Sequence, residues 1–302
     1  MVGESPEDRA REHGMSTLTA GSAIVQRAAR VAARRIVHRT RGLSHGPITR
    51  LVSPSDLGEL IKPFVFLDHF DLQPAERAKL GIHPHSGIAT FTLLLSGSVA
   101  YEDTTGKSGV LPAGGLEWMR AGAGVWHDGG PADLSRMHGL QLWVALPPEQ
   151  ENAPPQSQYV APAEVPQLGA VSVALGQHGA ARSPVDAPEF INYLHVKLQN
   201  GQRWQYEPPA GHTVAWVFVY AGRIDASEPV TAGELAVFEE SNRPLELASR
   251  GDAGFVLGSA IKHPHDLVLG SYSVHSSAAT LRRGEAEIQR IGQRLRAQGR
   301  LR

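Results

Sequence analysis

The chain has 302 residues, no cysteine and a formal net charge of −1. Its length suits two domains of ordinary size or one large barrel. The lack of cysteine excludes disulfides and thiolate metal sites. The balanced charge argues against nucleic acid as the main ligand, and no apolar run reaches the ~18 residues that cross a membrane. Histidine, with 14 copies, is therefore the residue whose positions carry most information about chemistry.

The N-terminal segment, residues 1–35, is predicted to be a disordered, basic arm. Residues 20–50 contain seven arginines and no acidic residue. Such a run could bind an anionic partner or act as a targeting peptide, but its arginines more commonly stay solvated or pair with acids elsewhere, which we favour. No secretion-type apolar stretch follows, so we expect a cytoplasmic protein. Met15 is an alternative start to Met1.

Short apolar runs separated by Gly, Pro and Asp dominate residues 36–275. They are too short for helices and are bounded by turn residues, so we predict β-strands. The clearest runs are residues 63–67, 90–95, 140–146, 193–198, 214–220 and 254–257. Many short strands with turns between them favour a sandwich or barrel.

A short internal repeat supports this architecture. In residues 92–99 and again in 217–224, an apolar run ends at a glycine. An Ala-Gly turn then opens another apolar run, in residues 111–118 and 230–238. Two copies of this order predict one β-fold used twice.

Domain boundaries follow from this reading. We predict an N-terminal barrel over residues 36–147, a connector rich in Pro, Gln and Ala over 148–188, and a C-terminal barrel over 189–275. In residues 276–302 the pattern changes to a helical period, which predicts a terminal helix capped by Ser276 or Ser277. Its apolar face contains Leu281, Ile288, Ile291 and Leu295.

A His-Pro-His motif carries the most specific chemical signal. His83 and His85 precede a predicted strand, and residues i and i+2 of an extended chain point to the same face. His127 lies 42 residues beyond His85. Three imidazoles from neighbouring strands can form one face of a divalent-metal site with open positions. The alternative is that they are ordinary surface or hydrogen-bonded histidines. A second such motif, residues 263–265, has no third histidine in a comparable strand context after it and is predicted to be a loop.

Two further residues are candidates to hold the outer nitrogen of a ligand histidine. Asp103 follows a predicted Gly turn, and His138 lies beside the run at 140–146. The alternatives are that Asp103 only completes a turn and that His138 is a core histidine. The C-terminal half has no comparable histidine pair in a strand, so we expect no metal there.

Three stretches of the chain resemble the pirin family of bicupins. They are PFVFLDHFDL (63–72), IHPHSGIATF…GAGVWHD (82–128) and MHGLQLWVALP (137–147), and the C-terminal GSYSVHSS…LRRGEAEIQRIG is similar to the end of some bacterial pirin-like proteins. The resemblance implies an all-β bicupin, with two cupin (jelly-roll-like) β-barrels packed face to face and a short C-terminal helix. It also implies a mononuclear non-haem iron in the N-terminal barrel. Family members are associated with quercetin 2,3-dioxygenase activity or with regulation through protein contacts.

Carried onto this sequence, the family's histidine ligands fall on His83, His85 and His127. The family's glutamate ligand belongs two residues after the third histidine, where this chain has Gly129. A second glutamate, four residues after the motif, is replaced by Ala89. The expected site is therefore three neutral imidazoles without a carboxylate.

Two functions remain open from the sequence. The first is a quercetinase-like dioxygenase that holds Fe(II), or another divalent metal, and acts on a small enolic or phenolic substrate bound as an anion. The second is a non-enzymatic regulatory protein that binds a protein partner and has a weak or empty metal site. The chain has no phosphate-binding loop, nucleophile elbow or HExxH motif to suggest other chemistry.

Overall fold

The computed structural model describes residues 33–73 and 81–301. Most of the predicted basic arm, and the choice between Met1 and Met15, lie outside these residues. Where the arm is described, the expectation of disorder is wrong. Arg34 is buried and its Nε donates to the backbone oxygen of Glu239 at 2.7 Å, while Arg35 pairs with the Glu239 carboxylate at 3.1 Å. Arg34 Nη2 also donates to the Thr213 backbone oxygen, so two of the three guanidinium nitrogens of Arg34 bond to fixed backbone acceptors, which holds the chain in place.

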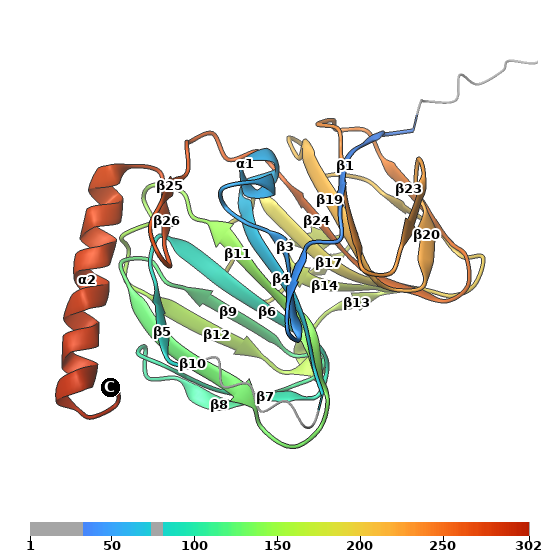
Figure 1. Ribbon diagram of the computed structural model, residues 1–302. Helices are drawn as coiled ribbons and strands as arrows, with labels where there is room; N and C mark the ends of the chain where they lie inside the picture. Colours follow the sequence, from blue (N-terminus) through green and yellow to red (C-terminus); the bar gives the residue numbers. More distant parts are fainter. Residues whose placement is uncertain (1–32, 74–80, 302) are drawn as a thin grey trace, which may run out of the picture. The chain divides into compact units, whose positions relative to one another are not determined.

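The N-terminal half folds into a seven-stranded and a four-stranded antiparallel sheet (Figure 1). In spatial order the larger sheet contains β12 (Gln156–Val160), β9 (Leu116–Arg120), β6 (Ile88–Ser96), β11 (Met137–Ala145), β4 (Phe64–Leu72), β3 (Ile48–Val52) and β2 (Leu43–His45). The smaller sheet contains β5 (His83–His85), β10 (Val125–Pro131), β7 (Ser98–Asp103) and β8 (Ser108–Pro112). A short helix, α1 (Leu57–Ile61), joins β3 to β4.

The C-terminal half repeats this plan. Its seven-stranded sheet contains β1 (Ile36–Thr40), β22 (Glu234–Phe238), β19 (Val214–Ala221), β24 (Ala253–Ala260), β17 (Ile191–Leu198), β14 (Val171–Leu175) and β13 (Gln167–Leu168). Its four-stranded sheet contains β18 (Arg203–Tyr206), β23 (Leu245–Ser249), β20 (Arg223–Asp225) and β21 (Pro229–Thr231). The remaining elements are the hairpin β15–β16 (Gln177–His178, Ala181–Arg182), the 3₁₀ turn η1 (Pro162–Glu164) and the pair β25–β26 (Val268–Leu269, Val274–His275).

The two large sheets pack against each other through apolar side chains. Along β6, Ala89, Phe91 and Leu93 belong to the cluster between the sheets, and the intervening residues face the barrel interior. Tyr193 and Trp216 enter the same cluster from the C-terminal half, and the Phe91 and Tyr193 rings meet edge to face at 5.3 Å. The protein is therefore an all-β bicupin, as expected, with its two barrels face to face.

The predicted internal repeat is confirmed at the level of single hydrogen bonds. Gly97 and Gly222 both have positive φ, and each accepts a bond at 2.9 Å from the alanine of the following Ala-Gly turn. A Cβ at either glycine would lie within 2.4 Å of a backbone oxygen. Only glycine fits there, which explains why the same short pattern occurs in both halves.

The predicted domain boundaries need two corrections. The connector over 148–188 contains β12, which extends the first large sheet, and β13 and β14, which belong to the second. Strands β12 and β13 are sheet edges, where polar residues are tolerated, so their composition resembles that of a linker. In addition β1, assigned by sequence to the N-terminal barrel, pairs with β22 of the C-terminal one.

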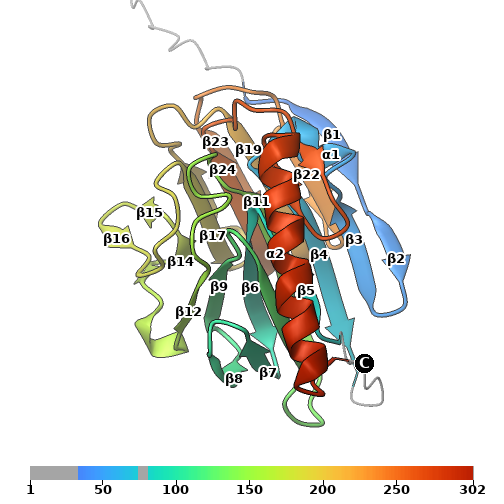
Figure 2. The same cartoon turned by 90° about the vertical axis from the view of Figure 1, so that its left-hand side faces the viewer.

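The chain ends in a helix, α2 (Ala278–Ala297), which lies along the N-terminal barrel (Figures 1 and 2). The Ser277 side chain caps it, and Ile288, Ile291 and Leu295 are buried as predicted. The Trp126 indole of β10 donates to the Ile288 carbonyl at 2.9 Å. No helix in the described ranges is long and apolar enough to cross a membrane.

Candidate metal centre

The three predicted histidines meet on two neighbouring strands of the small N-terminal sheet. His83 and His85 occupy alternate positions of β5, so both face the barrel interior. Strand β10 pairs antiparallel with β5 and places His127 directly opposite His83. Pro84, between the two histidines, needs no ladder hydrogen bond because β5 is an edge strand.

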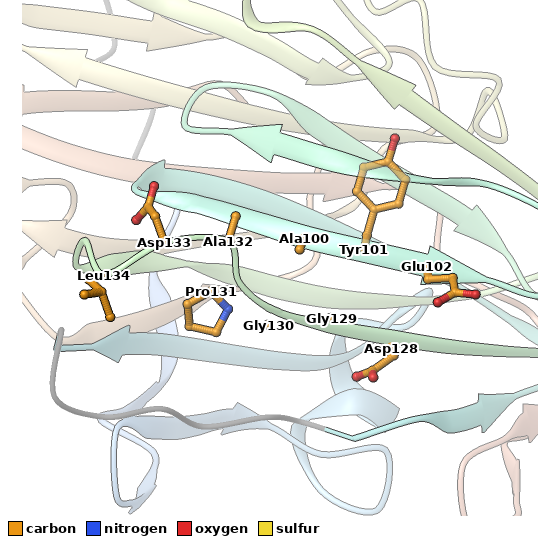
Figure 3. Close-up of a pocket in the computed structure, with 10 residues that line it drawn as sticks. All are labelled: Ala100, Tyr101, Glu102, Asp128, Gly129, Gly130, Pro131, Ala132, Asp133 and Leu134. Atoms are coloured by element: carbon orange, nitrogen blue, oxygen red, sulfur yellow. The ribbon is translucent and has the colours of Figure 1, made fainter. Parts of the chain in front are cut away.

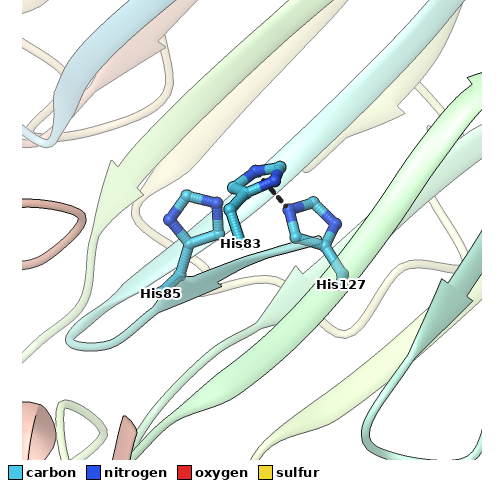
Figure 4. Close-up of side chains that lie close together, drawn as sticks. All are labelled: His83, His85 and His127. Carbon is cyan, nitrogen blue, oxygen red and sulfur yellow. Dashed lines mark hydrogen bonds between the residues drawn. The ribbon is translucent and has the colours of Figure 1, made fainter. Parts of the chain in front are cut away.

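One ring nitrogen of each histidine, the atom that could bind a metal, points toward a common centre (Figure 4). One nitrogen from each ring lies within 4.8 Å of the other two, and the Nε2 atoms of His83 and His127 are 3.0 Å apart. The Nε2 atom of His85 is buried and has no hydrogen-bond partner among the described residues. A buried nitrogen without a partner is costly, and a divalent cation at the centre of the three rings would satisfy it.

Burial keeps all three imidazoles neutral. Desolvation lowers the pKa of His85 to about 3, lowers the pKa of His127 well below its usual value, and lowers the pKa of His83 as well. For His85 and His127 the neighbouring imidazoles add to this lowering. Neutral imidazole is the form that binds metals. The cluster therefore presents three nitrogen donors at neutral pH, a donor set that fits a divalent transition metal.

Backbone carbonyls hold the outer nitrogens of the motif. His83 Nδ1 bonds to the Gly81 oxygen at 2.8 Å, and His85 Nδ1 bonds to the Tyr272 oxygen at 3.1 Å. Because a carbonyl only accepts, each Nδ1 carries the proton and each neutral ring has its lone pair at Nε2. Tyr272 is 187 residues from His85, a contact that the sequence pattern did not reveal.

The two residues predicted for this outer role have other partners. Asp103 accepts from the Thr105 backbone at 2.7 Å and from the Tyr159 hydroxyl at 3.1 Å, so it completes the β7–β8 turn. His138 Nε2 lies 2.7 Å from His69 Nε2. Its strand alternation places it on the same face as Leu140, toward the second sheet and away from the barrel interior. The second His-Pro-His motif lies in a loop, as predicted.

Beside the cluster the barrel contains a small chamber of about 80 Å³ that opens beside a larger cleft of about 670 Å³. His83 and His127 line the chamber, and Tyr101, Asp128 and Gly129 line both spaces. Figure 3 shows Asp128 and Glu102 at one end of the cleft and Asp133 and Leu134 at the other. The chamber beside the histidines therefore has room for a small group, and the adjoining cleft has room for a larger one.

The two positions that lack a carboxylate differ in kind. Gly129 lines the chamber two residues beyond His127, and a Cβ there would meet only ordinary contacts, the nearest at 3.6 Å from Val99. Ala89 is fully buried in the apolar cluster between the two large sheets. A glutamate side chain at position 89 would point into that apolar cluster. Position 89 is therefore not one from which a carboxylate could line the chamber in this chain.

Sequence reasoning missed one carboxylate that does line the chamber. Glu117, on β9, is only 6 % exposed and shares the chamber wall with His83 and His127. Burial raises its pKa, and the nearby Asp103 raises it further. The signal that could have found it is a single acid in the otherwise apolar run Leu116–Met119, at a position whose alternation points into the barrel.

Comparisons with known proteins agree with this geometry. The Pirin family model matches residues 47–144. A Pseudomonas aeruginosa protein, provisionally named a quercetin 2,3-dioxygenase, is 30 % identical over 68 % of this chain and 77 % of its own length. Rat pirin is 31 % identical over 68 % of this chain and 74 % of its own length.

Solved structures show the same fold. A quercetin 2,3-dioxygenase from Acinetobacter baumannii superposes with a TM-score of 0.74 at 23 % identity, over 85 % of this chain and 95 % of that one. A bacterial pirin from Escherichia coli, solved with nickel(II), superposes with a TM-score of 0.59 at 18 % identity, over 76 % of this chain and 98 % of that one. On fold, motif and sequence identity together, the chain belongs to the pirin family.

Proposed function

We propose that the chain binds one divalent metal, Fe(II), through His83, His85 and His127, and uses it for dioxygenase chemistry on a small enolic or phenolic compound. The observation that carries the proposal is the convergence of three neutral imidazole nitrogens, one of them buried without a partner. The names of the Pseudomonas and Acinetobacter relatives support the reaction class.

Three histidine nitrogens arranged on one side of a bound metal would suit dioxygenase chemistry. When bound, the metal would supply Lewis acidity toward the substrate oxygen and a site for O₂. The three histidines occupy one face, which leaves the opposite face open for ligands. With no carboxylate among the ligands, the site carries the full charge of the metal and favours a substrate that binds as an anion.

The chamber limits the substrate. Its space of about 80 Å³ is far below the roughly 300–1,000 Å³ of a pocket that encloses a drug-sized ligand. We therefore expect either a compact enediol or hydroxypyranone, or a larger flavonol whose reacting ring enters the chamber while its other ring lies in the outer cleft.

A second function rests on Gly129. If the missing carboxylate leaves the metal too weakly held, the protein acts through a protein partner rather than by turnover. In this case the acidic cleft beside the chamber, with Glu102, Asp128 and Asp133, is the surface that such a partner would contact.

Metal content decides between the two. The wild type and His83→Ala are purified anaerobically with Fe(II) and analysed by plasma mass spectrometry. We expect about one iron per chain in the wild type and none in the variant, with O₂ uptake lost in parallel when a flavonol is added. Lys107→Ala, an exposed substitution in the β7–β8 turn, serves as the matched control. An iron-free wild type would overturn the enzymatic proposal and direct the search to protein partners.

A further inference from the structure

Glu117 stands at the centre of a cross-strand arrangement inside the N-terminal barrel. On one side of β9 the residue opposite Glu117 is Thr92 of β6, and on the other side it is Tyr159 of β12. Both partners reach it: the Thr92 hydroxyl donates to one carboxyl oxygen at 2.6 Å, and the Tyr159 hydroxyl lies 3.4 Å from the other. These contacts fix the carboxyl group against the chamber wall.

Within residues 33–73 and 81–301 this carboxyl group has no cationic partner. The charged group that shifts its pKa is Asp103, which raises it, and the arginines and lysines of the described residues form their ion pairs elsewhere. A buried carboxylate without a cation is expensive to ionise. Packing alone does not explain why an acid stands here beside three neutral histidines. A glutamine at position 117 would also accept the hydrogen bond from Thr92 and would carry no charge.

The two other acids that line the chamber are placed differently. Asp128 is only half-buried and also lines the outer cleft. Asp68 also lines the wall, but Arg50 bonds to both of its carboxylate oxygens. Because both oxygens of Asp68 accept hydrogen bonds from Arg50, this carboxylate is not available to take a proton from a ligand. Among the chamber-lining acids with buried side chains, Glu117 is the one that can exchange a proton with a ligand.

We propose that Glu117 is the catalytic base of this site, taking over the role left open by Gly129. The inference rests on the proposed function. The hydroxyl group of an enolic or phenolic ligand loses its proton, its O–H electron pair stays on the oxygen, and the proton forms a new O–H bond on the Glu117 carboxylate. The products are the bound enolate or phenolate and a neutral Glu117 side chain.

Tyr159 offers this proton a way out of the chamber. Its hydroxyl lies between Glu117, at 3.4 Å, and Asp103, at 3.1 Å. Asp103 in turn accepts from the Thr105 hydroxyl at 2.5 Å in the β7–β8 turn. Such a chain of hydroxyl and carboxyl groups can pass a proton without a charged tyrosine. A nearby divalent metal would favour the ionised form of Glu117, which offsets the cost of burying its charge.

The test reads the ionisation of a bound ligand rather than turnover. The protein is loaded with Zn²⁺ under anaerobic conditions and titrated at pH 7 with maltol, a compact hydroxypyranone, and separately with quercetin. Both probes change their absorption spectrum when the hydroxyl ionises. We expect the wild type to bind them as anions, and Glu117→Gln to bind one zinc but to lower the ionised fraction of the bound probe at least tenfold. Glu246→Gln, the same exchange at an exposed position on β23 of the other barrel, is the matched control and keeps the wild-type spectrum.

The outcomes separate this inference from the proposed function. A wild type that binds no zinc or neither probe contradicts both. A Glu117→Gln protein that binds an ionised probe as the wild type does overturns the role of Glu117 and leaves the metal site intact. Loss of zinc from Glu117→Gln, with the unfolding midpoint unchanged, would make Glu117 a metal ligand instead of the base. Glu117→Asp, which keeps an acid but shortens it, should restore part of the ionisation.

Discussion

The two barrels have the same seven-stranded and four-stranded sheets but different interiors. In the C-terminal barrel most inward positions of β17, β19 and β24 are apolar and buried; they are Leu194, Val196, Leu198, Ala215, Val217, Val219, Ala253, Phe255 and Leu257. The exceptions, Asn192 and Ser259, are buried polar residues near the strand ends. In the N-terminal barrel the corresponding face of the large sheet carries Thr90, Thr92, Glu117 and Gln141, and a chamber remains open.

The comparison shows how one fold divides its tasks. The C-terminal barrel uses its interior for hydrophobic stabilisation, which scales with the apolar area removed from water. The N-terminal barrel gives up part of that gain, and its polar groups instead face the three histidines. Its cost is limited because the shared apolar layer between the large sheets stabilises both halves.

The largest difference should appear when one large side chain is removed from each interior. Phe255 is fully buried in the filled barrel, so Phe255→Ala should destabilise the protein by about 3–5 kcal/mol. Phe70 lines the open chamber and is only partly buried, so Phe70→Ala removes less buried apolar surface and its cost should be clearly smaller. Urea denaturation of both variants measures this, and equal costs would contradict the contrast.

Acid should destabilise both barrels, and a metal should protect only one. Burial lowers the pKa of His212, in the C-terminal half, to about 4 and that of His85 to about 3. Below pH 6.5 the unfolded chain takes up protons that the folded one does not, so each buried histidine costs about 1.4 kcal/mol per pH unit until its folded pKa is reached. Stability therefore falls as pH drops from 6.5 to 4.

Unfolding midpoints with and without zinc, measured between pH 7 and pH 4, check this prediction. Zinc needs neutral imidazole and should raise stability through His85 and its neighbours, but not through His212. His212→Asn, a neutral replacement that can still bond to Ser259, should flatten the pH dependence in both conditions. If zinc no longer stabilised His212→Asn, then His212 and the three-histidine cluster would not contribute independently to the stability of the protein.

Helix α2 should tolerate no side chain at Gly284, where it packs against Ser86 of the N-terminal barrel. A Cβ at Gly284 would lie 2.4 Å from the Ser86 hydroxyl and 2.8 Å from His275 Nε2. Gly284→Ala should therefore cost about 1–3 kcal/mol, and it should weaken metal binding because Ser86 adjoins His85. Gly129→Ala, where a Cβ has room, is the control. Thermal melts and zinc titrations of both variants decide the point.

The smallest expected change is an increase in metal affinity. Gly129→Glu places a carboxylate on the chamber wall beside His127, at a position with space for a Cβ. A negatively charged ligand should strengthen metal binding by about tenfold, which corresponds to about 1.4 kcal/mol. Competition with a chromophoric chelator measures the change. Unchanged or weaker binding would show that the three-histidine set is already complete in this protein.

Local patterns in the sequence were enough to predict most of the strands and the histidine cluster. Short apolar runs bounded by turn residues locate β6, β11, β17 and β19, and the Gly and Ala-Gly turns mark the repeat, because these signals depend on a few neighbouring residues. The i, i+2 spacing of His83 and His85 likewise fixes a common direction for two imidazoles. The all-β architecture and the histidine cluster followed from such short-range rules, whereas the bicupin arrangement came from the resemblance to the pirin family.

What the tertiary structure decided involves residues far apart in the chain. The pairing of β1 with β22, the division of residues 148–188 between two sheets and the contact of the Tyr272 carbonyl with His85 join segments separated by many residues. No local pattern encodes such a pairing, because its free energy comes from burying surfaces that meet only in the folded chain. For the same reason the sequence presented Glu117 as one acid among many, and only the assembled barrel placed it beside the three histidines.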